Sequence, residues 1–98
     1  MATYVALFNW TDEGIKNFRE SPRRSEEFAS LVKRVGGTVR EELWTVGQYD
    51  VVCVIDFPDE ETGVAALLQV SSAGHVRSTT LRAFRAEEMA GIIAHASS

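Results

Sequence analysis

The chain has 98 residues, of which 45% are hydrophobic, and it carries a formal net charge of -4 at pH 7 with a pI near 5.1. This length suits one domain with a modest core, so we expect a single domain over residues 1–98. The acidic balance lacks the basic footprint of nucleic-acid-binding proteins, no apolar run approaches the roughly 20 residues of a membrane span, and no signal-like segment precedes the first strand pattern, so we expect a cytoplasmic protein without nucleic-acid or membrane partners.

The first part of the chain predicts one strand and one helical region. Residues 3–10 form the strand, and both of its faces are nearly all apolar. Thr11 follows as a predicted helix N-cap, because its hydroxyl can accept a hydrogen bond from the first turn. Ser21-Pro22 is a second start signal, since serine caps helices and proline is tolerated in the first turn. We therefore predict one kinked helix or two short ones, ending at Gly36-Gly37.

Two β-prone runs flank the segment Gly47-Gln48-Tyr49-Asp50 and predict a β-hairpin. The runs cover residues 38–46 and 50–57. A glycine in the connection permits the positive φ that tight turns require. Tyr49 and Asp50 put two polar groups at the hairpin tip, so the segment is both a turn and a possible site.

The rest of the chain predicts a helix, a strand and a terminal helix. Asp59 is a suitable N-cap for the first of these helices, which closes near Gly74. The strand covers residues 75–84, and residues 87–96 form the short terminal helix. The helix that follows Asp59 is expected to have one face formed by Val64, Leu67, Leu68 and Ser71.

The predicted order is β-α-β-β-α-β with an additional terminal helix, which indicates an α+β, ferredoxin-like fold. In this fold two helices cover one face of a four-stranded antiparallel sheet, and the other face is bare. The strands at residues 3–10 and 50–57 are apolar on both faces, and an uncovered apolar sheet of that size is unusual on a soluble monomer. We therefore predict a homodimer or a larger even oligomer, formed through this face.

Several motifs together resemble those of the GYD domain family, small bacterial proteins named for a Gly-x-Tyr-Asp segment. The resemblance covers nearly the whole chain and implies a ferredoxin-like fold of the dimeric α+β barrel kind, with no settled reaction. Family members often have asparagine after the glycine that opens the fourth strand, whereas this chain has His75, so a role for His75 would be particular to this protein. The motifs are Phe8-Asn9-Trp10-Thr11-Asp12, Ser21-Pro22-Arg23-Arg24, Gly47-Gln48-Tyr49-Asp50, Gly74-His75-Val76-Arg77 and Thr80-Leu81-Arg82-Ala83-Phe84.

Tyr49 and Asp50 are candidates for a hydrogen-bonding pair, with the phenol as donor and the carboxylate as base. Adjacent residues of a regular strand point to opposite faces, so the two share one site only if the turn contains a bulge. The alternative is that Asp50 accepts backbone N–H groups that close the turn. Tyr49 would then pack against a neighbouring strand or subunit.

His75 is the titratable side chain best suited to acid, base or metal-ligand chemistry near neutral pH. A zinc or iron site needs about three protein ligands, and the only other histidine, His95, lies near the end of the chain. Cys53 cannot form an internal disulfide, and inside an apolar run it is expected to be a core residue. We therefore predict no metal site.

Arg77 and Trp10 are the remaining strand residues with binding chemistry. A guanidinium suits a carboxylate or phosphate, although a solvated arginine or an intersubunit salt bridge is the alternative. Arg77 and Arg82 are an odd number of positions apart, so a regular strand places them on opposite faces. Large aromatics at strand ends, such as Trp10 and Trp44, line cleft mouths or interfaces as well as cores.

Three functions follow as hypotheses, and none implies a cofactor. The first is a homo-oligomeric small-molecule binding or regulatory module with a mostly apolar cavity. The second, by analogy with dimeric α+β barrels, is a cofactor-independent enzyme such as a monooxygenase or isomerase, and the third is a purely structural assembly subunit. Whether the protein is an enzyme stays open. The candidate ligand-binding residues are Asn9, Trp10, Tyr49, Asp50, His75 and Arg77.

Overall fold

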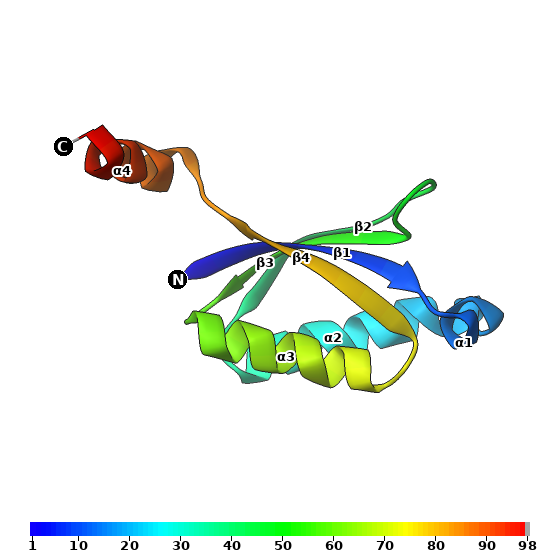
Figure 1. Cartoon of the computed structure of the whole chain (residues 1–98). Coiled ribbons are helices and arrows are strands. Elements are labelled where there is room, and N and C mark those ends of the chain that lie inside the picture. The colour runs from blue at the N-terminus through cyan, green and yellow to red at the C-terminus, as the bar shows by residue number, and fades with distance from the viewer. Residues whose placement is uncertain (98) are drawn as a thin grey trace.

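A four-stranded antiparallel sheet with the strand order β2-β3-β1-β4 forms one layer of the protein, and two long helices form the other (Figure 1). The structure, a computed structural model, describes residues 1–97. This arrangement confirms the predicted α+β, ferredoxin-like fold. The strands are β1 (Ala2–Trp10), β2 (Thr38–Trp44), β3 (Val51–Phe57) and β4 (Val76–Ala83), and the helices are α1 (Asp12–Lys16), η1 (Phe18–Glu20), α2 (Ser21–Arg34), α3 (Glu60–Ser72) and α4 (Ala86–Ser97).

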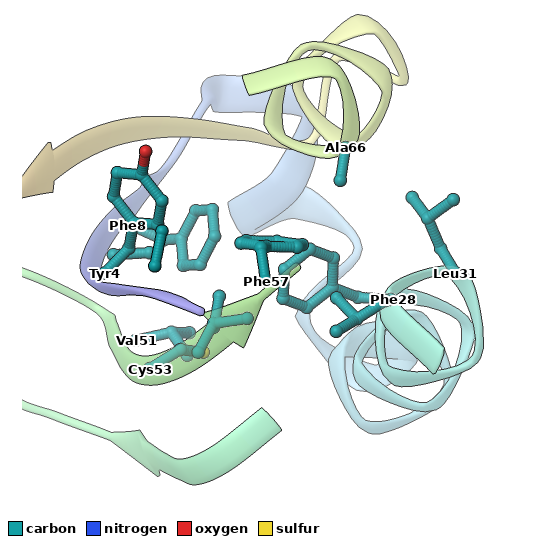
Figure 2. Packing of buried hydrophobic residues seen from close by; sticks show 12 residues of the cluster. Tyr4, Phe8, Phe28, Leu31, Val51, Cys53, Phe57 and Ala66 are labelled. Carbon is teal, nitrogen blue, oxygen red and sulfur yellow. The ribbon is translucent and has the colours of Figure 1, made fainter. Parts of the chain in front are cut away.

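Strand β1 lies at the centre of the sheet and alternates between its two faces. Ala6 pairs with Cys53 of β3 on one side and with Thr80 of β4 on the other. The even-numbered residues of β1 face α2 and α3, which follows from the two-residue period of a strand, and those from Ala2 to Phe8 are buried. Figure 2 shows how the aromatic rings fill this core. The rings of Tyr4 and Phe57, and those of Phe8 and Phe28, meet edge to face, with centroids 6.0 Å and 5.8 Å apart.

Two of the three predicted helix starts are confirmed. Thr11 Oγ1 accepts the backbone N–H of Gly14 at 3.1 Å, and Asp59 Oδ1 accepts that of Thr62 at 2.8 Å. The prediction that Ser21 caps α2 is wrong. Ser21 is the first helical residue, and the residue before it already has helical backbone angles because η1 runs directly into α2. A side-chain cap needs an extended residue at that position, and none is available.

Helix α3 packs on the sheet through small residues, so the face predicted for it is only in part the buried one. Gly63 and Ala66 are buried, whereas Val64 and Leu68 are 51% and 67% exposed. A Cβ atom on Gly63 would lie 2.8 Å from Cδ2 of Phe57, which is fully buried. The close approach of α3 to the aromatic core therefore fixes its rotation.

The face of the sheet opposite α2 and α3, which we call the open face, is uncovered in the single chain. Its centre consists of Val5, Leu7, Val52 and Val54, which are partly exposed, flanked by Leu43 and Leu81, which are 56% and 50% exposed. Helix α4 projects beyond the end of β4, away from α2 and α3 (Figure 1). None of its described residues is buried.

Asp56 of β3 is the one charged residue buried among residues 1–97, and it lies on the open-face side of the sheet. It accepts hydrogen bonds from Thr3 Oγ1 at 2.6 Å, Arg40 Nε at 2.8 Å and Arg85 Nη1 at 3.2 Å. Burial alone would raise the pKa of Asp56, but hydrogen bonds from Thr3, Arg40 and Arg85 outweigh it and lower the pKa to about 2. We call these four residues the Asp56 cluster.

We expect Asp56→Asn to lower the free energy of unfolding at pH 7 by on the order of 1–3 kcal/mol, because two arginines lose a charged acceptor. The folded-state pKa is below the unfolded value near 3.9, so this stability is complete above that value and is lost as the pH falls through about 2. Urea unfolding of both proteins between pH 7 and pH 2 measures the difference, with the exposed Asp12→Asn as control. A difference that stays constant across this range would contradict the assignment.

Candidate binding site

A cleft of about 670 Å³ lies between α2, α3 and the helix-facing side of the sheet, and we call it the α2–α3 cleft. It opens at the end of the sheet where β1 finishes and where β3 and β4 begin. Its volume falls within the roughly 300–1,000 Å³ of ligand pockets. Its floor is apolar, formed by Phe8, Phe28, Leu31, Val51, Val70 and Val76.

Strand β2 supplies the polar end of the cleft. Trp44 Nε1 donates a hydrogen bond to Ser21 Oγ at 2.9 Å, and the Ser25 hydroxyl donates to Glu42. The Cys53 thiol, fully buried beneath, lies 3.8 Å from the second oxygen of Glu42. Burial and the neighbouring Glu42 carboxylate raise the pKa of Cys53 to about 12, so the thiol is unreactive and Cys53 is a core residue, as predicted.

The wall formed by α2 carries charges of both signs. Arg23 pairs with Glu20 and, at 3.0 Å, with Glu27. Arg24 Nη2 donates to the backbone oxygen of Asn17 at 2.9 Å, which ties α2 to the preceding turn. An apolar floor with a charged, hydrogen-bonded rim suits a partner that inserts apolar groups and presents polar groups at the edge.

Of the six residues predicted from the sequence, Trp10 and His75 line the α2–α3 cleft, and Asn9, Tyr49, Asp50 and Arg77 do not. The His75 carbonyl accepts the backbone N–H of Thr11 at 3.1 Å, which fixes the start of β4 beside the end of β1. Arg77 pairs with Asn9 and is exposed on the open face. Arg82 pairs with Tyr4, so the two arginines lie on opposite faces of the sheet.

Residues 45–50 form the hairpin connection, which is longer than predicted because β2 ends at Trp44 and β3 begins at Val51. Gly47 has a φ of 135°, the positive value expected of it. Asp50 Oδ2 accepts the backbone N–H of Trp10 at 2.9 Å, and Asn9 Nδ2 donates to the Gln48 carbonyl at 2.7 Å. Within the described chain the side chains of Tyr49 and Asp50 are not hydrogen-bonded to each other.

The cleft also contains polar groups from α2, α3 and β2 that the sequence pattern did not predict as site residues, among them Ser21, Ser25, Glu42 and Gln69. The sequence did contain a signal for Glu42, because it ends a run of three charged residues and lies two positions before Trp44, on the same face of a strand. A register shift between Val39 and Glu41 places Glu42 opposite Cys53, on the helix-facing side. Strict alternation that starts from Val39, without this shift, would instead place Glu42 on the open face.

No group of three or more His, Cys, Asp or Glu side chains within residues 1–97 could hold a metal ion. In the same range, no helix has the length and apolar character needed to cross a membrane.

We expect Asp50→Ala to lower the free energy of unfolding by about 1–2 kcal/mol, because the Trp10 N–H loses its charged acceptor. Tyr49→Phe is the control, since the Tyr49 hydroxyl makes no hydrogen bond in the described residues, and it should change stability by less than about 0.5 kcal/mol. Chemical denaturation measures both. The opposite ranking of the two variants would show that Tyr49, not Asp50, holds the hairpin.

The sequence profile of the GYD domain matches residues 4–93, which is most of the chain. A protein of Thermus thermophilus named glutamine synthetase and cystathionine beta-lyase binding protein is 32% identical over 84 residues, which span 85% of this chain and 88% of that protein. The chain therefore belongs to the GYD domain family.

Proposed function

We propose that this protein is a homo-oligomeric binding module that regulates other proteins by associating with them, and that the α2–α3 cleft is its contact site. The observation that carries the proposal is the 32% identity, over 85% of the chain, to a relative named for binding two enzymes. The family profile, which matches residues 4–93, spans every residue that lines the cleft. Glutamine synthetase and cystathionine beta-lyase are therefore the first partners to test.

The composition of the cleft supports a protein partner. Trp10, Trp44, Arg23 and Arg24 all line it, and tryptophan and arginine are enriched among the residues that dominate binding energy at protein interfaces. Trp44 is 46% exposed although its indole N–H is hydrogen-bonded to Ser21. A partially exposed, fixed aromatic ring loses little conformational entropy when a partner covers it.

The binding test uses two tyrosine substitutions on α2. Ser30 is exposed and lines the cleft, whereas its neighbour Ala29 is exposed on the same helix and does not line it. We expect Ser30→Tyr to obstruct the cleft and weaken binding of purified glutamine synthetase or cystathionine beta-lyase at least tenfold, and Ala29→Tyr to bind like the wild type. Surface plasmon resonance measures both affinities. Equal weakening by the two variants, or no binding by the wild type, would contradict the proposal.

A small apolar molecule is the second candidate for the cleft, and the volume of about 670 Å³ favours it. The same two variants test this function. A metabolite that raises the melting temperature of the wild type and of Ala29→Tyr, but not of Ser30→Tyr, would support it.

Self-association through the open face is the second part of the proposal, and the exposed apolar side chains of that face support it. We expect Val52→Lys to convert an oligomer into a 10.8 kDa monomer at micromolar concentration, because Val52 lies between Leu7 and Leu43 at the centre of the face. Val64→Lys is the control, since Val64 is exposed on the outer side of α3. Light scattering that finds the wild type monomeric would remove this part of the proposal.

A further inference from the structure

Helix α4 carries three large apolar side chains along one side, Met89, Ile92 and Ile93, which we call the α4 stripe. Their exposed fractions are 44%, 40% and 55%, and α4 has 12 residues. A helix of this length is marginal in water by itself, because nucleation is costly and most helical stability in proteins comes from packing. The α4 stripe therefore needs a surface to pack on.

Contacts at Arg85 fix the direction in which the chain enters α4. Its Nη1 donates to Thr3 Oγ1 at 2.7 Å and to Asp56 Oδ1 at 3.2 Å, and its backbone N–H donates to Glu88 Oε1 at 2.9 Å. These contacts hold α4 beyond the end of the sheet, on the side away from α2 and α3 (Figure 1). A second copy that covers the open face would lie on this same side.

We propose that the α4 stripe packs against the β2–β3 hairpin of a second copy, and that the second copy makes the same contact in return. This inference rests on the self-association proposed above. The hairpin presents Val46, which is fully exposed, and Leu43, which is 56% exposed. It rises on the same side of the sheet as α4, at the opposite end of the molecule (Figure 1).

The size of the open face supports an additional contact. Four strands spaced about 4.8 Å apart, with a paired region about seven residues long, cover roughly 19 Å by 23 Å, or about 440 Å² of projected face. A stable interface buries about 800 Å² from each partner. Two α4 helices, each about 18 Å long and about 10 Å wide, enlarge this projected area by about 360 Å² when each packs on the other chain.

The charges favour a pairing in which the two ends of the sheet are exchanged. Arg77 is exposed on the open face at the hairpin end, and the first turn of α4 carries Glu87 and Glu88 at the other end. A two-fold axis that runs across the strands brings Arg77 of one copy toward the acidic turn of its partner. An axis along the strands would instead place β4 over the partner's β2 and would leave Arg77 at the end of the sheet away from the acidic turn.

Disulfide trapping in the 98-residue chain tests the contact directly. The double variant with Val46→Cys and Ile92→Cys should form a covalent dimer under mild oxidation, whereas Val46→Cys with Ala94→Cys should not, because Ala94 lies on the far side of α4. The native Cys53 does not compete, since it is buried. A covalent dimer from Ile92→Cys alone would indicate α4-to-α4 pairing, and a bridge within one chain would place α4 on its own body; either result overturns the proposal.

The dissociation constant of the dimer gives an independent measure. Ile92→Glu with Ile93→Glu should raise it at least tenfold, and Ala94→Glu should leave it unchanged, as determined by sedimentation equilibrium. Circular dichroism checks that the body of the protein is intact. If Val52→Lys separates the copies and the double glutamate variant does not, only the α4 contact is wrong. If the wild type is monomeric, both the α4 contact and the proposed self-association are wrong.

Discussion

The buried carboxylate of Asp56 joins four segments of the chain that are distant in sequence. Thr3 of β1, Arg40 of β2 and Arg85 after β4 all donate to it, while Asp56 itself belongs to β3. A buried carboxylate without these donors would be costly, so the three partners must be held in place once the sheet forms. Two features on which the proposals rest, the polar end of the cleft and the position of α4, are connected to these contacts.

Arg40 connects the Asp56 cluster to the cleft. It lies at the register shift in β2, where Arg40 and Glu41 both point to the open-face side. Arg40 is the extra residue of this bulge. Because of it, Val39 packs against the core and Glu42 and Trp44 also face the helices. Without the bulge, Trp44 and Glu42 would lie on the open face, and the polar end of the cleft would be lost. Arg85 plays the corresponding part for α4, because its bonds to Thr3 and Asp56 set where that helix begins.

The sequence predicted the fold well because local signals determine it. Strand alternation in β1, the capping chemistry of Thr11 and Asp59 and the positive φ of Gly47 each depend on a few neighbouring residues. The candidate site was predicted only in part, for a different reason. Trp10 and His75 reach the cleft because they stand where strands end or begin, which the element order reveals. The bulge at Arg40 and the rotation of α3 about Gly63 depend on contacts with β3, and no local pattern encodes them.

The two faces of the sheet have separate consequences for binding. The α2–α3 cleft lies on the helix side, so pairing of two copies through their open faces would leave both clefts accessible, pointing outward in opposite directions. Linked sites gain affinity only where geometry permits both to engage at once. Two clefts that face away from each other cannot both contact one flat surface of a partner. A dimer built in this way would therefore join two partner molecules. Its regulatory effect would come from bringing the two together, and not from a higher affinity for one of them.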